Sequence, residues 1–118
     1  MEKNITVRLT ARLFAEEKCY GPGVEQLLKA VEKHRSLRAA AASMSMAYSK
    51  AWSIIRAAEQ GFGCKLLHST IGGAGGGGAV LTDEARQIMD AYGEYCRRLN
   101  EYGQGLFQEL FGFCAKGE

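Results

Sequence analysis

A run of glycines constrains this chain more than any other feature of its sequence. Six of the seven residues in Gly72-Gly73-Ala74-Gly75-Gly76-Gly77-Gly78 are glycine. Because glycine loses more conformational freedom on folding than any other residue, this run is predicted to lie outside regular helices and strands. The apolar residues at 66–67 and 79–81 are typical of short strands. We therefore predict a β-hairpin over residues 66–81 with the glycines at its tip; a linker without regular structure is the alternative.

The glycine run also matches the spacing of a nucleotide-binding motif, but in the wrong context. Gly73, Gly75 and Gly78 satisfy the G-x-G-x-x-G pattern of dinucleotide-binding proteins. That motif follows a strand and opens a helix, whereas an apolar strand is expected after Gly78. The lysine and hydroxyl residue that complete a P-loop are absent from this position as well. Neither nucleotide-binding motif is therefore predicted here.

Residues 36–58 have the pattern of two short helices joined by a tight turn. Ser36 is expected to cap the first helix, because its hydroxyl can accept a hydrogen bond from a free amide. Four alanines at 39–42 favour that helix and let a neighbouring helix pack closely. After a turn at 44–46, a second helix is expected over 47–58. Its shared face holds Ala51, Trp52, Ile55 and Ala58. The pair is predicted to be a helix-turn-helix unit, and an ordinary helical hairpin is the alternative.

Basic residues are concentrated in the middle of the chain, although the formal net charge is only +2. Residues 33–82 contain a single acid, Glu59. The bases of this segment are Lys33, Arg35, Arg38, Lys50, Arg56 and Lys65. Acids balance bases before the segment and outnumber them after it. A polyanion such as double-stranded DNA is therefore expected to bind the middle of the chain.

The outward face of the second helix is predicted to carry hydrogen-bond donors and no acid. Such side chains suit phosphate oxygens and base edges, whereas a face that meets only solvent normally mixes both signs of charge. The predicted DNA contacts are Tyr48, Ser49 and Ser53 for bases or sugars, Arg38, Lys50 and Arg56 for phosphates, Ser45 in the turn, and Gly73, Gly75 and Gly76 in the hairpin tip.

The N-terminal part of the chain is predicted to form a β-hairpin followed by a helix. Ile5, Val7 and Leu9 alternate with polar residues, which is the period-two pattern of a half-buried strand. A hairpin is therefore expected over residues 4–20. A first helix is expected over residues 23–34, with an apolar stripe that consists of Val24, Leu27, Leu28 and Val31.

A long amphipathic helix is predicted over residues 82–111, with Thr82 as its N-cap. Its length would be roughly 45 Å at 1.5 Å per residue, which is too long for a small domain to cover. A bend or break is expected near Gly103, because glycine is costly in a helix interior. The exposed seam predicts a homodimer through contacts of Ile88, Tyr92, Tyr95, Leu99, Tyr102 and Leu106.

Composition narrows the class of protein further. A chain of 118 residues, 47% of them hydrophobic, is expected to form one mainly α domain with a small β component. No apolar run is long enough to cross a bilayer, so no membrane partner and a cytoplasmic location are expected. The four cysteines form no C-x-x-C pair, and Cys64 and His68 alone do not make a site. No metal, cofactor or catalytic residue is predicted, so the chain is not expected to be an enzyme.

Together these motifs resemble the DNA-binding domain of ModE-type molybdate-dependent regulators, which is related to the LysR-type winged helix-turn-helix. The resemblance covers about Val7 to Phe111. The residues that carry it are Gly21-Pro22-Gly23, Ser36-Leu37 with Ala39-Ala40-Ala41, Tyr48 with Lys50-Ala51-Trp52, and the glycine run with Ala79, Leu81 and Thr82. It implies a winged helix-turn-helix with an N-terminal β-hairpin and a long C-terminal dimerisation helix. It also implies a homodimer whose second helices enter successive major grooves of a palindromic operator, with the N-terminal strands joining the dimer contact.

Three positions depart from the family pattern. The family usually has glycine at Ser45, serine at Ala47 and lysine at Ala74. The change at Ala47 removes a helix cap worth about 1 kcal/mol, which Ser45 is expected to replace if the helix begins earlier. Family members that sense molybdate carry further C-terminal domains, so no molybdate site is expected in a sequence that ends at Glu118. The alternative function is a protein interaction module that keeps the fold without operator binding, and a separate sensor or effector protein is left open.

Overall fold

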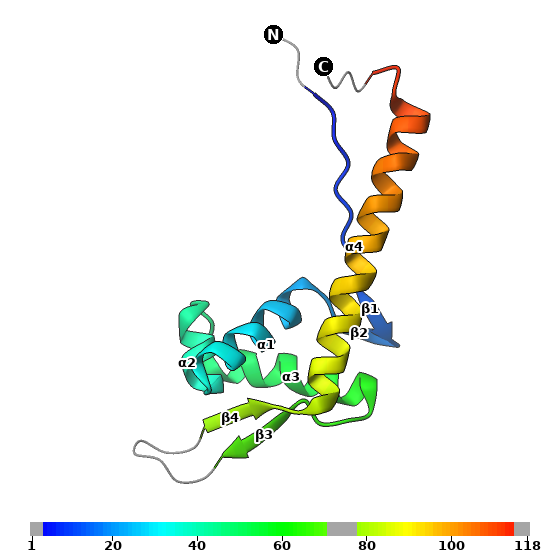
Figure 1. Ribbon diagram of the computed structural model, residues 1–118. Helices are drawn as coiled ribbons and strands as arrows, with labels where there is room; N and C mark the ends of the chain where they lie inside the picture. The colour runs from blue at the N-terminus through cyan, green and yellow to red at the C-terminus, as the bar shows by residue number, and fades with distance from the viewer. Residues whose placement is uncertain (1–3, 71–77, 115–118) are drawn as a thin grey trace.

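The computed structural model describes residues 4–70 and 78–114, which form helices and two small β-hairpins (Figure 1). In chain order the elements are β1 (Leu13–Ala15), β2 (Glu17–Tyr20), α1 (Pro22–His34), α2 (Leu37–Ser43), α3 (Tyr48–Phe62), β3 (Leu67–Thr70), β4 (Gly78–Leu81) and α4 (Asp83–Phe111). Each hairpin is antiparallel and two-stranded. The predicted fold class, a mainly α winged helix-turn-helix with a long C-terminal helix, is confirmed.

The core lies where α1, α2 and α3 meet, with β4 packed against α1. The apolar stripe of α1 is buried as its spacing predicts, and Leu27, Leu28 and Val31 have no exposed surface. Ile55 of α3 and Leu66 ahead of β3 are fully buried in the same cluster. Since α2 buries only small alanines and Leu37, it can approach its neighbours closely, which positions the start of α3.

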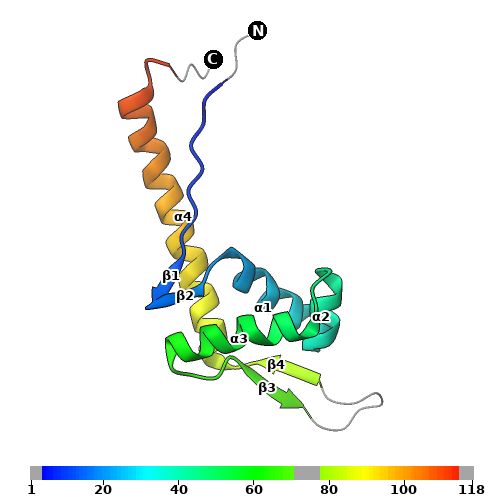
Figure 2. The same ribbon diagram turned by 180° about the vertical axis from the view of Figure 1, so that it is seen from behind.

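Residues 4–12 form no strand, so the strand predicted from the alternation of residues 5–9 is wrong. The hairpin is confined to β1 and β2. The alternation still has a structural basis, because Val7 and Leu9 are half-buried while their neighbours are exposed. The segment runs beside α4 in both views (Figures 1 and 2), and Gln104 Nε2 donates to the Val7 carbonyl over 3.1 Å. Its apolar side therefore packs on a helix instead of completing a sheet.

Helix α4 is one unbroken element of 29 residues, so the break predicted near Gly103 does not occur. A Cβ at Gly103 would overlap the Leu9 side chain, so the glycine gives the N-terminal segment room to pack against α4. No helix in the described parts of the chain is both long and apolar enough to cross a bilayer.

The hairpin β3–β4 is the wing, and hydrogen bonds attach its base to three other elements. The Ala79 amide donates to the Arg35 carbonyl at the end of α1 over 3.0 Å. The Leu66 amide donates to Glu59 Oε2 of α3 over 2.9 Å. Thr82 joins the wing to α4, since its hydroxyl donates to the Lys65 carbonyl (2.8 Å) and accepts from the Ala85 amide (3.0 Å). The tip, with the predicted contacts Gly73, Gly75 and Gly76, lies outside the described residues.

Candidate nucleic-acid interface

The helix-turn-helix is formed by α2 and α3, as the sequence predicts. Ser36 caps α2, because its Oγ accepts from the Ala39 amide over 3.0 Å. The turn closes through the Met46 amide, which donates to the Ala41 carbonyl over 2.9 Å. Ser45 lies in this turn with a φ of 54°, in the left-handed region that favours glycine.

The start of α3 has no side-chain cap. Its N-cap residue is Ala47, and the structure gives it no side-chain hydrogen bond. The expectation that Ser45 replaces the missing cap is therefore wrong, because α3 begins no earlier than Tyr48. The first amides of α3 consequently remain available to an external acceptor such as a phosphate oxygen.

Four sides can be distinguished on α3. One is buried in the core through Ala51, Ile55 and Ala58. The opposite face is an exposed ridge formed by Ser49, Ser53, Arg56 and Gln60. Two flanks separate these faces: Tyr48 and Trp52 lie on the flank toward the wing, whereas Lys50 and Ile54 lie on the other. Gln60 was not predicted as a contact, although it continues the spacing of Ser49 and Ser53 by two further turns.

The flank toward the wing carries a row of two aromatic rings with a guanidinium group at each end. The Arg38 guanidinium lies 4.1 Å from the centroid of the Tyr48 ring. The Tyr48 and Trp52 rings meet edge to face at 6.4 Å, and the Arg56 guanidinium lies 5.7 Å from the Trp52 centroid. These distances fall within the range of cation–π attraction, which holds both guanidinium groups at the surface of the helix-turn-helix.

A groove separates this row from the wing. Its walls include Arg38 and Trp52 on one side and Lys65 and Ser69 on the other. Glu59, the single acid of the basic segment, lies in the same groove, but its Oε2 accepts the Leu66 amide. The acid therefore has a structural partner at the base of the wing. Trp52 and Lys65 were not among the predicted contacts, because their place in the groove depends on how the wing packs.

The seam predicted on α4 is only partly available to another molecule. Tyr92 is buried in its own subunit: its hydroxyl donates to the Ala11 carbonyl over 2.8 Å, and its ring meets Tyr20 edge to face. Burial, followed by the neighbouring Cys96, raises the pKa of Tyr92 to about 12. The other predicted members differ in exposure: Ile88 and Leu99 are half-buried, and Tyr95, Tyr102 and Leu106 are exposed.

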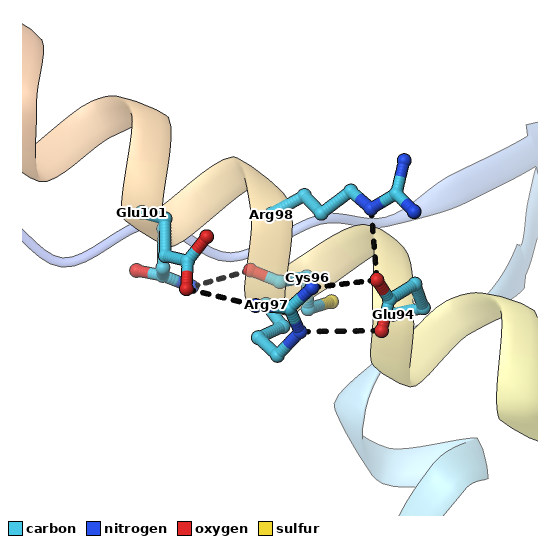
Figure 3. Close-up of polar contacts among 6 residues, drawn as sticks. Glu94, Cys96, Arg97, Arg98 and Glu101 are labelled. Atoms are coloured by element: carbon cyan, nitrogen blue, oxygen red, sulfur yellow. Dashed lines mark hydrogen bonds and ion pairs between the residues drawn. The ribbon is translucent and has the colours of Figure 1, made fainter.

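A cluster of ion pairs marks a separate, charged face of α4 (Figure 3). Arg97 contacts both Glu94 (2.7 Å) and Glu101 (2.8 Å), and Arg98 contacts Glu94 over 2.8 Å. Hydrogen bonds from Arg97 and Arg98 lower the pKa of Glu94 to about 2. These charges neutralise one another within the helix, so this face offers little attraction to a polyanion.

No described part of the chain gathers three or more metal-ligating His, Cys, Asp or Glu side chains. Cys64 and His68, which are four residues apart in the sequence, lie just ahead of and within β3. Burial, together with the nearby carboxylates Glu84 and Glu59, raises the pKa of the Cys64 thiol and so disfavours the thiolate that a metal would bind.

Comparison with known proteins identifies the same region. The profile of bacterial regulatory helix-turn-helix proteins of the LysR family matches residues 26–86. This range begins within α1, contains α2, α3 and the wing, and ends in the first turn of α4. The matched part therefore coincides with the surface described above.

Several curated proteins are similar to the chain over a longer range. The transcriptional regulator ModE of Haemophilus influenzae is 28% identical over 105 residues, which are 89% of this chain and 39% of that protein. The DNA-binding transcriptional dual regulator ModE of Escherichia coli is 32% identical over 75% of this chain and 32% of its own length. The molybdenum-pterin-binding protein MopB of Rhodobacter capsulatus is 34% identical over 57% of this chain and 25% of its length. The chain thus spans between a quarter and two fifths of these relatives.

Proposed function

Because this chain belongs to the LysR family of bacterial regulatory helix-turn-helix proteins, we propose that it regulates transcription by binding a specific DNA operator as a homodimer. The observation that carries the proposal is the exposed ridge of α3, which contains no acid and has guanidinium groups fixed beside it. Side chains with hydroxyl, amide and guanidinium groups are the ones that hydrogen-bond to base edges and phosphates.

In the proposed complex, α3 lies in the major groove with its ridge toward the bases. Ser49, Ser53 and Gln60 contact base edges, and the Tyr48 hydroxyl contacts a base or sugar. Arg38, Lys50 and Arg56 contact phosphates, and the free amides at the start of α3 donate to a further phosphate oxygen. The tip of the wing, including Gly73, Gly75 and Gly76, lies along the adjacent backbone.

The exposed part of the α4 seam supports the proposed dimer. Tyr95, Tyr102 and Leu106 are large apolar side chains with 57%, 72% and 40% of their surface exposed. A second copy would cover them and place two α3 helices on half-sites about 34 Å apart, one turn of the duplex. The operator would then share the two-fold symmetry of the protein and read as a palindrome.

The function is tested by selecting duplexes from a random pool and measuring affinity for the selected operator across a salt series. Each phosphate contact contributes about 0.9 to the slope of log K against log salt. The double variant Lys50→Ala, Arg56→Ala is expected to lower this slope by about 1.8 for each bound subunit. Arg98→Ala is the control, because it removes a cation from α4 (Figure 3), outside the helix-turn-helix. A pool that yields no preferred duplex would contradict the proposal.

Binding by these 118 residues is further proposed to be independent of molybdate, since the proposed DNA and dimer contacts all lie within them. Adding molybdate is expected to leave operator affinity unchanged. Calorimetry that shows stoichiometric molybdate binding to the 118 residues would contradict this part of the proposal.

A protein interaction module is the second candidate, and the aromatic end of α4 favours it. The rings of Phe107, Phe111 and Phe113 stack in sequence, and Phe113 is 80% exposed. The two candidates separate in the same selection experiment, because an interaction module without operator binding shows only weak and sequence-indifferent affinity for duplexes.

A further inference from the structure

A second basic surface lies beside α3, on the flank away from the wing. Three cationic side chains from separate parts of the chain line one shallow hollow there: Arg12 ahead of β1, Lys18 of β2 and Lys50 of α3. The other residues that line it are apolar or uncharged, and none of these described residues is acidic. We call Arg12, Lys18 and Lys50 the hairpin-side cations.

We infer that Arg12 and Lys18 bind the phosphate backbone of the operator, so that the protein contacts both strands on either side of α3. This inference rests on the proposed function. A helix with its side chains is about 10–12 Å wide and the major groove about 12 Å, so a backbone lies close to each flank of an inserted helix. Arg38 and Lys65 face one strand on the wing side, and the hairpin-side cations face the other.

The position of Lys18 relative to α3 is fixed by close packing. A Cβ on Gly61 of α3 would lie 2.6 Å from the Cβ of Cys19, the neighbour of Lys18, so the Cys19 side chain packs directly on the backbone of α3. On the inner side of β2, the hydroxyl of the buried Tyr20 donates to Glu25 Oε1 over 2.6 Å. The strand that carries Lys18 is therefore packed against α3 and hydrogen-bonded to α1.

Arg12 is held in a comparable way from the other side. The preceding residue, Ala11, accepts the hydroxyl of the buried Tyr92 over 2.8 Å. The Arg12 side chain also passes close to Gly21, where a Cβ would lie 3.3 Å from its Cγ. Both cations are thus presented from anchored backbone, which lowers the entropy lost when they bind a phosphate.

The acidic tip of the hairpin limits the extent of this surface. Glu16 and Glu17 form the turn and the start of β2, and with Lys18 and Gln60 they line the next hollow along α3. Carboxylates repel a phosphodiester backbone, so the contacts are expected to end at Lys18. The change of sign within three residues therefore defines one edge of the DNA footprint.

The test replaces each cation by glutamine in the full chain and measures operator affinity across a salt series. For a dimer, Arg12→Gln and Lys18→Gln are each expected to lower the slope by about 1.8, since two phosphate contacts are lost. At 0.15 M salt, each lost contact corresponds to about a fivefold loss of affinity. Arg98→Gln is the matched control and should keep the wild-type slope. Circular dichroism and sedimentation test whether each variant remains folded and keeps the oligomeric state of the wild type.

Ethylation interference gives a second measurement that does not depend on affinity. Phosphates whose ethylation blocks the wild-type protein, but not the Arg12→Gln, Lys18→Gln double variant, should lie on the strand opposite the wing contacts.

If the slope stays at the wild-type value in both variants while the Lys50→Ala, Arg56→Ala variant lowers it, the inference is overturned and the proposed function stands. Loss of the dimer in either variant would assign this surface to a protein contact and also overturn the inference. A wild-type protein that selects no duplex overturns both.

Discussion

At the scale of single residues, the turn between α2 and α3 is where the chain departs from an ideal helix-turn-helix. Ser45 adopts a left-handed conformation that a residue with a Cβ rarely occupies, with a φ of 54°. Two positions later Ala47 leaves the start of α3 without a side-chain cap. Both features lower stability at the point where the protein is proposed to enter the major groove.

Replacing Ser45 with glycine is expected to stabilise the fold. The substitution removes the left-handed strain of about 1–2 kcal/mol and adds part of the entropy cost of glycine, for a net gain of about 0.5–1 kcal/mol. Urea unfolding followed by circular dichroism measures this change. Ser43→Gly is the matched control, because Ser43 lies within α2 and the same substitution there should destabilise by about 0.5 kcal/mol. A Ser45→Gly variant that is less stable than wild type would refute the strain.

At the scale of elements, local patterns predicted what depends on local structure. The stripe of α1, the Ser36 and Thr82 caps and the extent of α4 follow from spacing and capping chemistry that neighbouring residues determine. The strand predicted at the N-terminus is wrong, because apolar and polar residues alternate in any extended segment that has one buried side. Only tertiary packing shows that α4 is the cover.

The candidate site divides in the same way. Lys50 and Arg56 could be predicted because helical spacing alone places them outside the core face of α3. The roles assigned to Trp52, Arg12 and Lys18 could not, because each depends on a neighbour that is distant in sequence: the wing groove for Trp52 and the hairpin-side hollow for the cations. Tyr92 fits the heptad spacing of the seam, but its side chain is buried in its own subunit. It contacts Ala11 of the N-terminal segment and the ring of Tyr20.

The ion-pair cluster on α4 leads to a prediction about pH. The pKa of Glu94 is lowered from 4.5 to about 2 in the fold, so its pairs stabilise the protein fully above about pH 4.5 and cease to do so as the pH falls through 2. The melting temperature of wild type should exceed that of Glu94→Gln at pH 6, and the difference should vanish near pH 2. Because the side chains are exposed, 1 M salt should reduce the difference as well.

A matched variant controls for the change of net charge. Glu109→Gln removes an acid from the same helix, and Glu109 forms no ion pair with a described residue. A difference between wild type and Glu94→Gln that is constant from pH 6 to pH 2 would contradict a role for the Glu94 pairs.

At the scale of the whole molecule, the shape of the subunit supports the proposed homodimer. The longest extent of the subunit is 60 Å, and the upper part of α4 projects far from the core (Figure 1). Its exposed apolar side chains have no cover within the described subunit other than the N-terminal segment. We propose that the second copy supplies it.

Tyr102→Glu is expected to break this proposed dimer. It replaces an apolar side chain that is 72% exposed with a charged one, which is costly to bury in the interface. Sedimentation equilibrium should show a monomer at micromolar concentration. Operator affinity should fall by at least about 100-fold, since two linked half-site contacts become one. Gln108→Glu adds the same charge to another face of α4 and should remain dimeric. A Tyr102→Glu protein that stays dimeric would exclude this surface.

The hydroxyl of Thr82 couples the orientation of the wing to that of α4. It hydrogen-bonds both the base of the wing and the first turn of α4, and the residue itself is only 2% exposed, so the two elements are joined by a buried contact. The arm beyond it is about 43 Å long. A tilt of about 5° at one end therefore moves the other by about 4 Å, close to the 3.4 Å rise of one base pair. In the proposed dimer, a tilt of this size between the two α4 helices would change the spacing of the two wings on the operator by about one base pair.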